Sequence, residues 1–346
     1  MSSRTPSQAG SRPPASPKSH DLRRAVALWL GDGRAQGHTA KTHDERHATM
    51  ERFAWWLENE AGLSPTLDSL DPHSMRAFLS YLREPRPEGR WGTDHANARR
   101  TMRPSAVDSY YRILRAFANW CGAEGLLDTE PLKNVKAPRI PNDQIQPFSD
   151  EQVTMLLSGA RNGPVPQRDE AILLILLDSG MRVSELCQLN CGDADRGEGR
   201  LWVTGKGNKR RPVFIGKETR RALWRYREHV RYSDNDGRIR EPPADAPLFV
   251  AVSNRYQGQR LTTNGVHNLV SRAGARSGIT GVRCSPHTCR HTFAVSFLRN
   301  GGNIFELQMI MGHEDLTVLR RYVALAQADV EDAHRRASPV DRRKRR

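Results

Sequence analysis

A proline-rich stretch near the middle of the sequence divides the chain into two parts. Residues 133–147 contain three prolines and three basic residues but few large apolar side chains, a composition typical of an extended linker. The 346 residues also exceed what one small hydrophobic core organises, and they suit two domains. We therefore expect a first domain over residues 21–132, the linker, a second domain over residues 148–334, and tails at 1–20 and 335–346.

The first domain is predicted to be a small helical bundle. Four runs place apolar residues at helical spacing, and their predicted starts or caps are Leu22, Thr39 or Thr42, Asp71-Pro72, and Pro104. Tyr110 and Tyr111 fall on the apolar face of the last run. We interpret both tyrosines as core residues and not as base-stacking ones.

The charge of the chain indicates a polyanionic partner. There are 54 Lys and Arg residues against 39 Asp and Glu, a net charge of +15 that is spread along the chain. In the first domain, the candidate phosphate contacts are Arg99, Arg100, Arg103 and Arg115. DNA is the favoured partner, although the helical domain alone carries no specific motif and its residues also fit another partner or a solvated surface.

Membrane and secreted classes are not favoured. The longest unbroken apolar run covers seven residues, 171–177, which is too short to span a bilayer. Residues 1–20 are rich in Ser and Pro, lack an apolar core, and are predicted to form a disordered basic arm. Five cysteines without a disulfide-framework pattern fit a reducing compartment. We expect a cytoplasmic, bacterial protein that associates with the nucleoid.

Two groups of side chains resemble metal sites at first sight: Cys284, His287, Cys289 and His291, and the pair His43 and His47. If residues 287–291 are helical, Cys289 faces away from His287 and four ligands cannot converge. The pair His43 and His47 lacks the H-E-x-x-H order of zinc proteases and fits a solvated helix face. No metal site is therefore predicted.

The second domain opens with a helix-capping signal, Ser149 followed by Gln152. The apolar run AILLILL predicts a buried helix, after which the chain turns at Gly180 into the segment GMRVSEL. Arg182 and Glu185 in this segment lie three residues apart, close enough for an ion pair that orients the guanidinium. On these residues alone, a structural ion pair and a catalytic arginine fit equally well.

A hairpin follows. The segment LWVTGKGNKRRPVFI alternates apolar and polar residues around Gly205–Asn208. Lys206 lies at the tip of this hairpin, and Lys209 lies close enough to be mistaken for it. The other basic residues of the hairpin, Lys209, Arg210 and Arg211, are candidate DNA-backbone contacts. A phosphate-binding P-loop is excluded, because its spacing and its following helix are absent.

The segment from Ser285 to Tyr322 gathers side chains suited to phosphate chemistry. Pro286 predicts a helix start, and His287 and Arg290 then share one helix face. A second helix over 304–311 ends before Gly312-His313, and a third carries Leu316, Leu319 and Val323 on its inward face and Tyr322 nine residues after His313. Arginine matches phosphate oxygens and a tyrosine hydroxyl can act as a covalent nucleophile.

In this order, the motifs resemble the tyrosine recombinase (phage integrase) family. The resemblance is firm over about residues 146–325 and looser over the helical domain; Cys289 and Met311 stand where leucine is usual. It implies six catalytic residues: Arg182, Lys206, His287, Arg290, His313 and Tyr322. Tyr322 would be the nucleophile of a 3′-phosphotyrosyl intermediate, and Lys206, which matches the family's hairpin lysine, would reach into the minor groove as the general acid for the departing 5′ oxygen. His287 would act as base toward the tyrosine proton or help position the phosphate. No cofactor, metal or ATP is expected.

The resemblance also implies a fold and an assembly. We expect a mainly helical protein with a small β-sheet, in which a SAM-like core-binding domain precedes an α+β catalytic domain. A homotetramer on double-stranded recombination sites is expected, with an accessory DNA-bending protein or a partner recombinase as a further partner. The basic tail favours an integrase or transposase of a mobile element. The alternatives are a Xer-like dimer resolvase, a type IB topoisomerase-like enzyme, and a non-catalytic DNA-binding protein.

Overall fold

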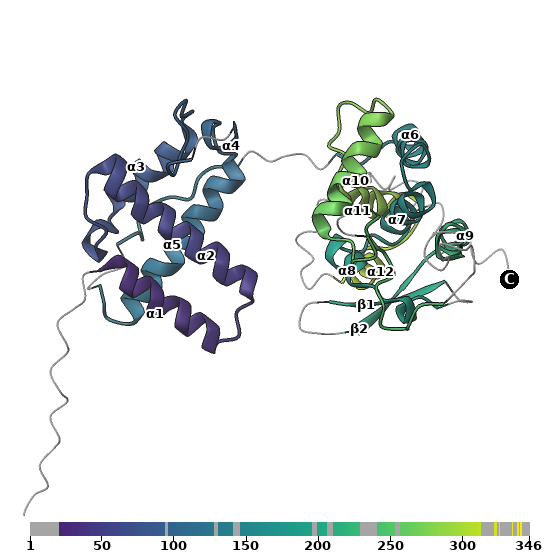
Figure 1. Ribbon diagram of the computed structural model, residues 1–346, viewed down its shortest axis with the longest axis horizontal. Coiled ribbons are helices and arrows are strands. Elements are labelled where there is room, and N and C mark those ends of the chain that lie inside the picture. Colours follow the sequence, from purple (N-terminus) through teal and green to yellow (C-terminus); the bar gives the residue numbers. More distant parts are fainter. Residues whose placement is uncertain are drawn as a thin grey trace, which may run out of the picture. The chain divides into compact units, whose positions relative to one another are not determined.

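The computed structural model describes residues 21–93, 96–127, 131–140, 146–195, 199–205, 210–228, 241–252 and 257–312, with residues 322, 323, 325, 334, 338 and 340. The chain separates into two compact units, residues 1–143 and 144–346. Helices build most of both units, and the named strands of the described residues form one two-stranded sheet (Figure 1). The predicted fold class, mainly helical with a small sheet, is confirmed.

The first unit contains α1 (Leu22–Ala35), α2 (Ala40–Trp56), α3 (Pro72–Arg83), α4 (Ala96–Arg99) and α5 (Pro104–Ala123), with a π-helical turn Leu57–Ala61 and a 3-10 turn Leu67–Ser69. Three of the predicted helix starts are confirmed in detail. Thr39 caps α2 by accepting from the Thr42 N–H, Asp71 caps α3 ahead of Pro72, and Pro104 is the first residue of α5.

Aromatic side chains dominate the core of this unit. Phe78 packs edge-on against Phe53 and Tyr110, at centroid distances of 5.1 and 5.9 Å. Tyr110 and Tyr111 are buried in the same core, as the periodicity of α5 predicts.

The basic segment between α3 and α5 is ordered around a buried guanidinium. Arg90 is only 1% exposed and donates to the carbonyl oxygens of Ala98 at 2.9 Å and of Arg100 at 2.5 Å. Because a buried guanidinium must use its donors, these bonds fold the segment onto itself. Arg99, Arg100 and Arg103 remain exposed on it.

The second unit contains α6 (Asp150–Arg161), α7 (Pro166–Ser179), α8 (Val183–Gln188), a 3-10 turn Cys191–Asp193, β1 (Arg200–Thr204), β2 (Arg210–Phe214), α9 (Lys217–Tyr226), α10 (Thr263–Arg276), α11 (Pro286–Arg299) and α12 (Ile304–Met311). The apolar helix α7 lies in its core and packs against α6, α9 and α11. The predicted capping box of Ser149 and Gln152 is present at the start of α6. The predicted hairpin is present too, with β1 and β2 antiparallel and Leu201 opposite Val213.

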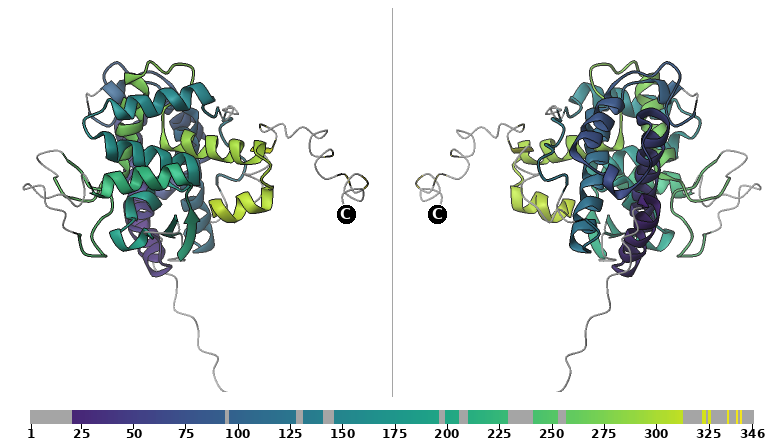
Figure 2. Two further views of the ribbon diagram at one scale, coloured as in Figure 1. Left: turned by 90° about the vertical axis from the view of Figure 1, so that its right-hand side faces the viewer. Right: turned by 90° about the vertical axis from the view of Figure 1, so that its left-hand side faces the viewer.

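Helices α11 and α12, at the yellow-green end of the ribbon in Figure 2, contact each other. A separate small hydrophobic core lies between them. Tyr322 packs into this core and is 2% exposed. Val323 is 40% exposed, so its predicted inward position is wrong, because the buried tyrosine takes that side of the chain. Leu316 and Leu319 lie outside the described residues.

The five cysteines are all free, and four of them are buried. No helix in the described part of the chain has both the length and the hydrophobicity needed to cross a membrane.

Candidate active site

A sharp turn after α7 places Arg182 at the start of α8, next to the end of α12. Gly180 ends α7 in the left-handed conformation with φ of 59°, and a Cβ at this position would lie 2.2 Å from the Phe293 ring. Glycine alone fits that space and that backbone angle without strain. Arg182 follows as the N-cap of the short helix α8.

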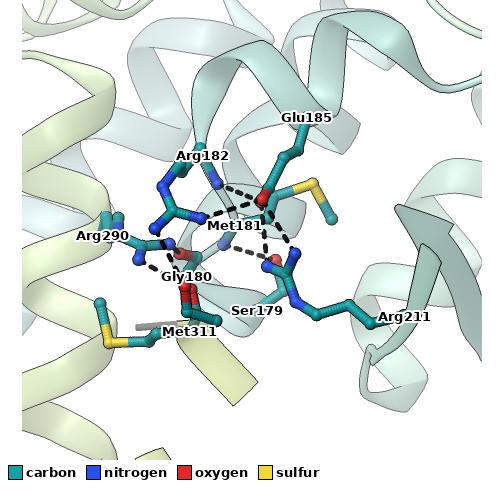
Figure 3. Close-up of polar contacts among 9 residues, drawn as sticks. Ser179, Gly180, Met181, Arg182, Glu185, Arg211, Arg290 and Met311 are labelled. Atoms are coloured by element: carbon teal, nitrogen blue, oxygen red, sulfur yellow. Dashed lines mark hydrogen bonds and ion pairs between the residues drawn. The ribbon is translucent and has the colours of Figure 1, made fainter. Parts of the chain in front are cut away.

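The carboxylate of Glu185 holds two arginines (Figure 3). It accepts from the Arg182 backbone N–H at 2.9 Å and from Arg182 Nη1 at 3.1 Å. On its other side, Arg211 of β2 donates from Nη1 and Nη2 at 2.9 and 3.1 Å. Burial alone raises the pKa of Glu185, but the hydrogen bonds from Arg211 and Arg182 outweigh it and leave the pKa below its usual value. The predicted ion pair of Arg182 and Glu185 is thus present, with an unpredicted third member.

The second arginine comes from α11. Arg290 is 4% exposed and donates to the Gly180 and Met311 carbonyls, the latter at 3.0 Å. Arg182 donates from Nη2 to the Gly312 carbonyl at 3.1 Å. The two guanidiniums therefore hold two consecutive carbonyls at the end of α12, where helix carbonyls lack intrahelical partners (Figure 3).

Burial and the charge of Arg182 lower the pKa of Arg290 to about 10, while Glu185 and Tyr322 act in the opposite direction. At neutral pH the guanidinium stays charged, so the site presents two fixed cations. Planar guanidiniums with fixed orientation are suited to the non-bridging oxygens of a phosphodiester.

The end of α12 fixes the turn that leads to His313. Gly312 has a φ of 61°, as the predicted Gly-His turn requires, and a Cβ there would lie 2.9 Å from Arg211 Cζ. His313 itself lies outside the described residues, and so do Lys206 and Lys209 of the hairpin tip. Their predicted roles stay predictions.

His287 and Arg290 share one face of α11, as predicted, and His287 is exposed. Partial burial of the ring and the charge of Arg290 lower the pKa of His287. Its imidazole is therefore neutral at physiological pH and can donate to one phosphate oxygen through its ring N–H.

The structure adds a residue that the catalytic pattern omits. His291 follows Arg290 on α11, and its Nδ1 lies 2.7 Å from the Tyr322 hydroxyl, with the two ring centroids 5.6 Å apart. From the sequence alone, His291 is named only as a member of a candidate zinc site, which is rejected. Its spacing of four from His287 places the two imidazoles on one helix face, which is the signal that identifies it.

The predicted DNA contacts fall into two groups. Arg99, Arg100 and Arg103 are exposed on the first unit. The second group is partly buried or ion-paired: Arg115 donates to the Tyr111 hydroxyl at 2.6 Å, Arg210 to Asp193 at 2.5 Å, and Arg211 to Glu185.

Among the residues that the structure describes, no group of three or more His, Cys, Asp or Glu side chains is placed to hold a metal ion. Cys289 is fully buried in the core of the second unit, and burial raises the pKa of its thiol to about 12. It is an apolar core residue in this fold.

The chain is similar to known proteins in sequence and in fold. Residues 147–329 match the model of the phage integrase family. Tyrosine recombinase XerD of Xanthomonas campestris pv. campestris is 31% identical over 315 residues, 90% of this chain and 89% of the relative. Tyrosine recombinase XerC of Yersinia pestis is 30% identical over 290 residues, 80% of this chain and 89% of the relative.

Among solved structures, the Tn1549 transposon integrase in complex with a circular intermediate DNA has a similar fold, with a TM-score of 0.65 at 19% identity over 89% of this chain and 99% of that one. A lambda integrase dimer bound to a core site has a TM-score of 0.62 at 15% identity over 88% of this chain and 77% of that one. With the family match, the Xer relatives and the fold in agreement, the chain belongs to the phage integrase family and is a tyrosine recombinase.

Proposed function

We propose that the protein exchanges DNA strands between two specific duplex sites, with Tyr322 as the nucleophile. Its hydroxyl attacks the scissile phosphodiester, a Tyr322 oxygen–phosphorus bond forms, and the bond from phosphorus to the 5′ oxygen breaks. One ester replaces another, so the 3′-phosphotyrosyl link retains the energy needed for rejoining and neither ATP nor a metal enters the scheme. The single observation that carries the proposal is the convergence of Arg182 and Arg290 on one end of α12, beside the buried Tyr322.

The two arginines stabilise the charge of the transition state. Their guanidiniums are already oriented by Glu185, Gly180 and the carbonyls at the end of α12, so little reorganisation is needed when phosphate binds. His287 and His313 add hydrogen bonds to the phosphate. Lys206, at the tip of the hairpin, protonates the departing 5′ oxygen.

The first unit acts as the second half of a DNA clamp. Its exposed arginines Arg99, Arg100 and Arg103 lie on one segment that Arg90 holds in place, and they contact the phosphate backbone. Arg210 and Lys209 extend the contact from the catalytic unit. Such contacts make affinity fall steeply with salt.

The enzyme assembles as a tetramer on two duplexes. Support comes from an apolar groove of about 880 Å³ between β2, α11 and α12, lined by Phe214, Phe293, Phe297, Met309 and Ile310. Phe214 is 63% and Met309 72% exposed, and exposed apolar surface of this kind marks protein contacts. We assign the groove to the C-terminal segment of a neighbouring subunit that follows Leu325, because Leu325 packs against the α11–α12 core of its own chain.

Two biological roles fit a recombinase that acts on DNA in the cytoplasm. Integration or transposition of a mobile element is supported by the basic tail at 335–346 and by the fold shared with a transposon integrase. Resolution of chromosome or plasmid dimers is supported by the XerC and XerD relatives, which align with most of this chain. The position of the crossover site, in an element end or in a chromosomal terminus, separates these roles.

A strand-exchange assay tests the proposed function. Sites are first recovered by sequencing DNA that stays bound to the protein after an SDS quench. Two labelled duplexes that carry a recovered site should then yield recombinant duplexes and Holliday junctions. Relaxation of one supercoiled plasmid without any recombinant product would instead identify a topoisomerase-like enzyme, and binding without cleavage would identify a DNA-binding protein.

A further inference from the structure

The hydroxyl of Tyr322 faces one imidazole in the core between α11 and α12. Its oxygen lies 2.7 Å from Nδ1 of His291, a normal distance for a strong hydrogen bond, and Tyr322 is 2% exposed. Water therefore has little access to the phenol in this arrangement. A buried nucleophile needs a protein group to take its proton, because bulk solvent cannot.

The charge state of His291 suits that task. Burial is the main cause that lowers the pKa of His291 to about 4, and electrostatic interactions with His287 and Arg290 lower it further. The imidazole is neutral at physiological pH, and with its proton on Nε2 the Nδ1 atom accepts from the phenol. Among the residues that the structure describes, the titratable groups that face His291 are His287 and Arg290 on its own helix and Tyr322 from the segment after α12.

We propose that His291 accepts the proton of the Tyr322 hydroxyl as that hydroxyl attacks the scissile phosphate. The proton moves from the phenol to Nδ1 while the new oxygen–phosphorus bond forms, and the proton for the leaving 5′ oxygen comes separately from Lys206. In the religation step both transfers reverse. The proposal rests on the proposed role of Tyr322 as the nucleophile.

Phosphate binding improves His291 as a base. The phosphodiester brings a negative charge to Arg290, and this charge offsets the positive field that keeps protons off His291. A proton on His291 is therefore most favourable when substrate is bound, which confines nucleophile activation to the enzyme–DNA complex.

His287 then has a different task. It is exposed one helical turn before His291, with the two ring centroids 6.0 Å apart. In this position His287 is available to the phosphate that Arg290 is proposed to bind, while His291 faces the Tyr322 phenol. The two histidines thus divide phosphate binding and proton transfer between them.

The test compares two variants of His291 on a suicide substrate, a duplex nicked near the cleavage position so that the cleaved product cannot be religated. The duplex carries a site recovered by sequencing the DNA that stays bound after an SDS quench. His291→Ala removes the acceptor, whereas His291→Asn keeps an acceptor near the position of Nδ1 that cannot take a proton. We expect both variants to form the Tyr322 adduct about 100-fold more slowly at neutral pH. The deficit should shrink as the pH approaches the ordinary phenol pKa of about 10, and free imidazole should accelerate His291→Ala alone. His73→Asn, an exposed position on α3, is the matched control and should cleave at the wild-type rate.

A second readout needs no DNA and reports on the contact itself. In nitrogen-15 NMR spectra of the histidine side chains, Tyr322→Phe should shift the Nδ1 resonance of His291 and leave that of His73 in place. An unshifted resonance would refute the contact. Two results would overturn the proton-transfer role. One is cleavage by His291→Asn at the wild-type rate; the other is a loss of cleavage rate that does not change with pH and that free imidazole does not restore. If Tyr322→Phe still forms adducts, the proposed nucleophile fails, and that result is separate from any result for His291.

Discussion

Arg211 and Glu185 form a bidentate ion pair, in which Nη1 donates to Oε1 at 2.9 Å and Nη2 donates to Oε2 at 3.1 Å. Glu185 is 4% exposed and the Arg211 side chain 20% exposed. The pair links the strand that leads away from the hairpin tip to the residue that orients Arg182. Arg211, which the sequence predicts as a DNA contact, thus holds Glu185 and through it helps to orient Arg182.

We predict that Arg211→Ala slows cleavage at saturating DNA by about tenfold or more, because a hydrogen bond to a charged group contributes about 1.5–3 kcal/mol. Arg211→Lys keeps the charge but not the fork and should recover only part of the rate. Single-turnover kinetics on the suicide duplex measure both. Arg221→Ala, an exposed arginine paired with Glu218 on α9, is the control. A variant that loses only affinity, with a shallower salt dependence, would show that Arg211 contacts DNA phosphate instead.

Glu185 itself should matter for stability. Glu185→Ala leaves the guanidiniums of Arg182 and Arg211 facing each other without their shared counterion. This change costs about 3–5 kcal/mol in fully buried pairs and less here, because the Arg182 side chain is 39% exposed. Because the folded pKa of Glu185 is lowered, the ionised carboxylate binds its partners more tightly than the protonated one. Its contribution is present above the unfolded pKa of about 4.3 and is lost as the pH falls through the lower folded value. Urea unfolding of wild type and variant at pH 7 and in acid checks this; equal stability at pH 7 would contradict it.

His291 gives a second pH dependence with the same direction. Its pKa is lowered to about 4 from the usual 6.5, so between these values the unfolded chain binds a proton that the folded chain does not. Stability therefore falls as the pH drops from 6.5 toward 4, by about 2 kcal/mol once partial solvent contact is discounted. His291→Asn should lack this component of the pH–stability profile. A profile identical to that of the wild type would place His291 in a more polar environment.

Gly312 provides a test of the turn between α12 and His313. Gly312→Ala forces a φ of 61° on alanine and places its Cβ 2.9 Å from Arg211 Cζ, so we predict at least tenfold slower cleavage with DNA binding retained. Gly278→Ala is a close control, because Gly278 has a φ of 67° and open space around its Cβ. Both variants carry backbone strain of about 1–2 kcal/mol, and only the first displaces Arg211. Equal rates for the two would refute the steric coupling.

Local signals in the sequence predict local structure well here. Caps at Thr39, Asp71 and Ser149 and the turns at Gly180 and Gly312 depend on neighbours a few residues away, and the structure confirms each of them. The arginine–glutamate pair of α8 is predictable for the same reason.

Long-range relationships are not predictable in this way. Arg210 and Arg211 are adjacent on β2, and only the packing of the hairpin against α8 decides that the second one faces Glu185. His291 reaches Tyr322 across 31 positions in sequence, and periodicity within α11 does not say what lies opposite. The exposed Val323 shows the same limit, since a helical pattern alone does not identify the buried face.

The most direct measurement of the central claim is the identity of the residue that carries the DNA. Wild-type protein is incubated with DNA that contains a recovered site, quenched in SDS, digested with nuclease and trypsin, and analysed by mass spectrometry, beside Tyr322→Phe. We expect a nucleotide attached through a 3′-phosphate to the peptide that contains Tyr322, and no adduct in the variant. A nucleotide on another residue, or an undiminished adduct in Tyr322→Phe, would contradict it.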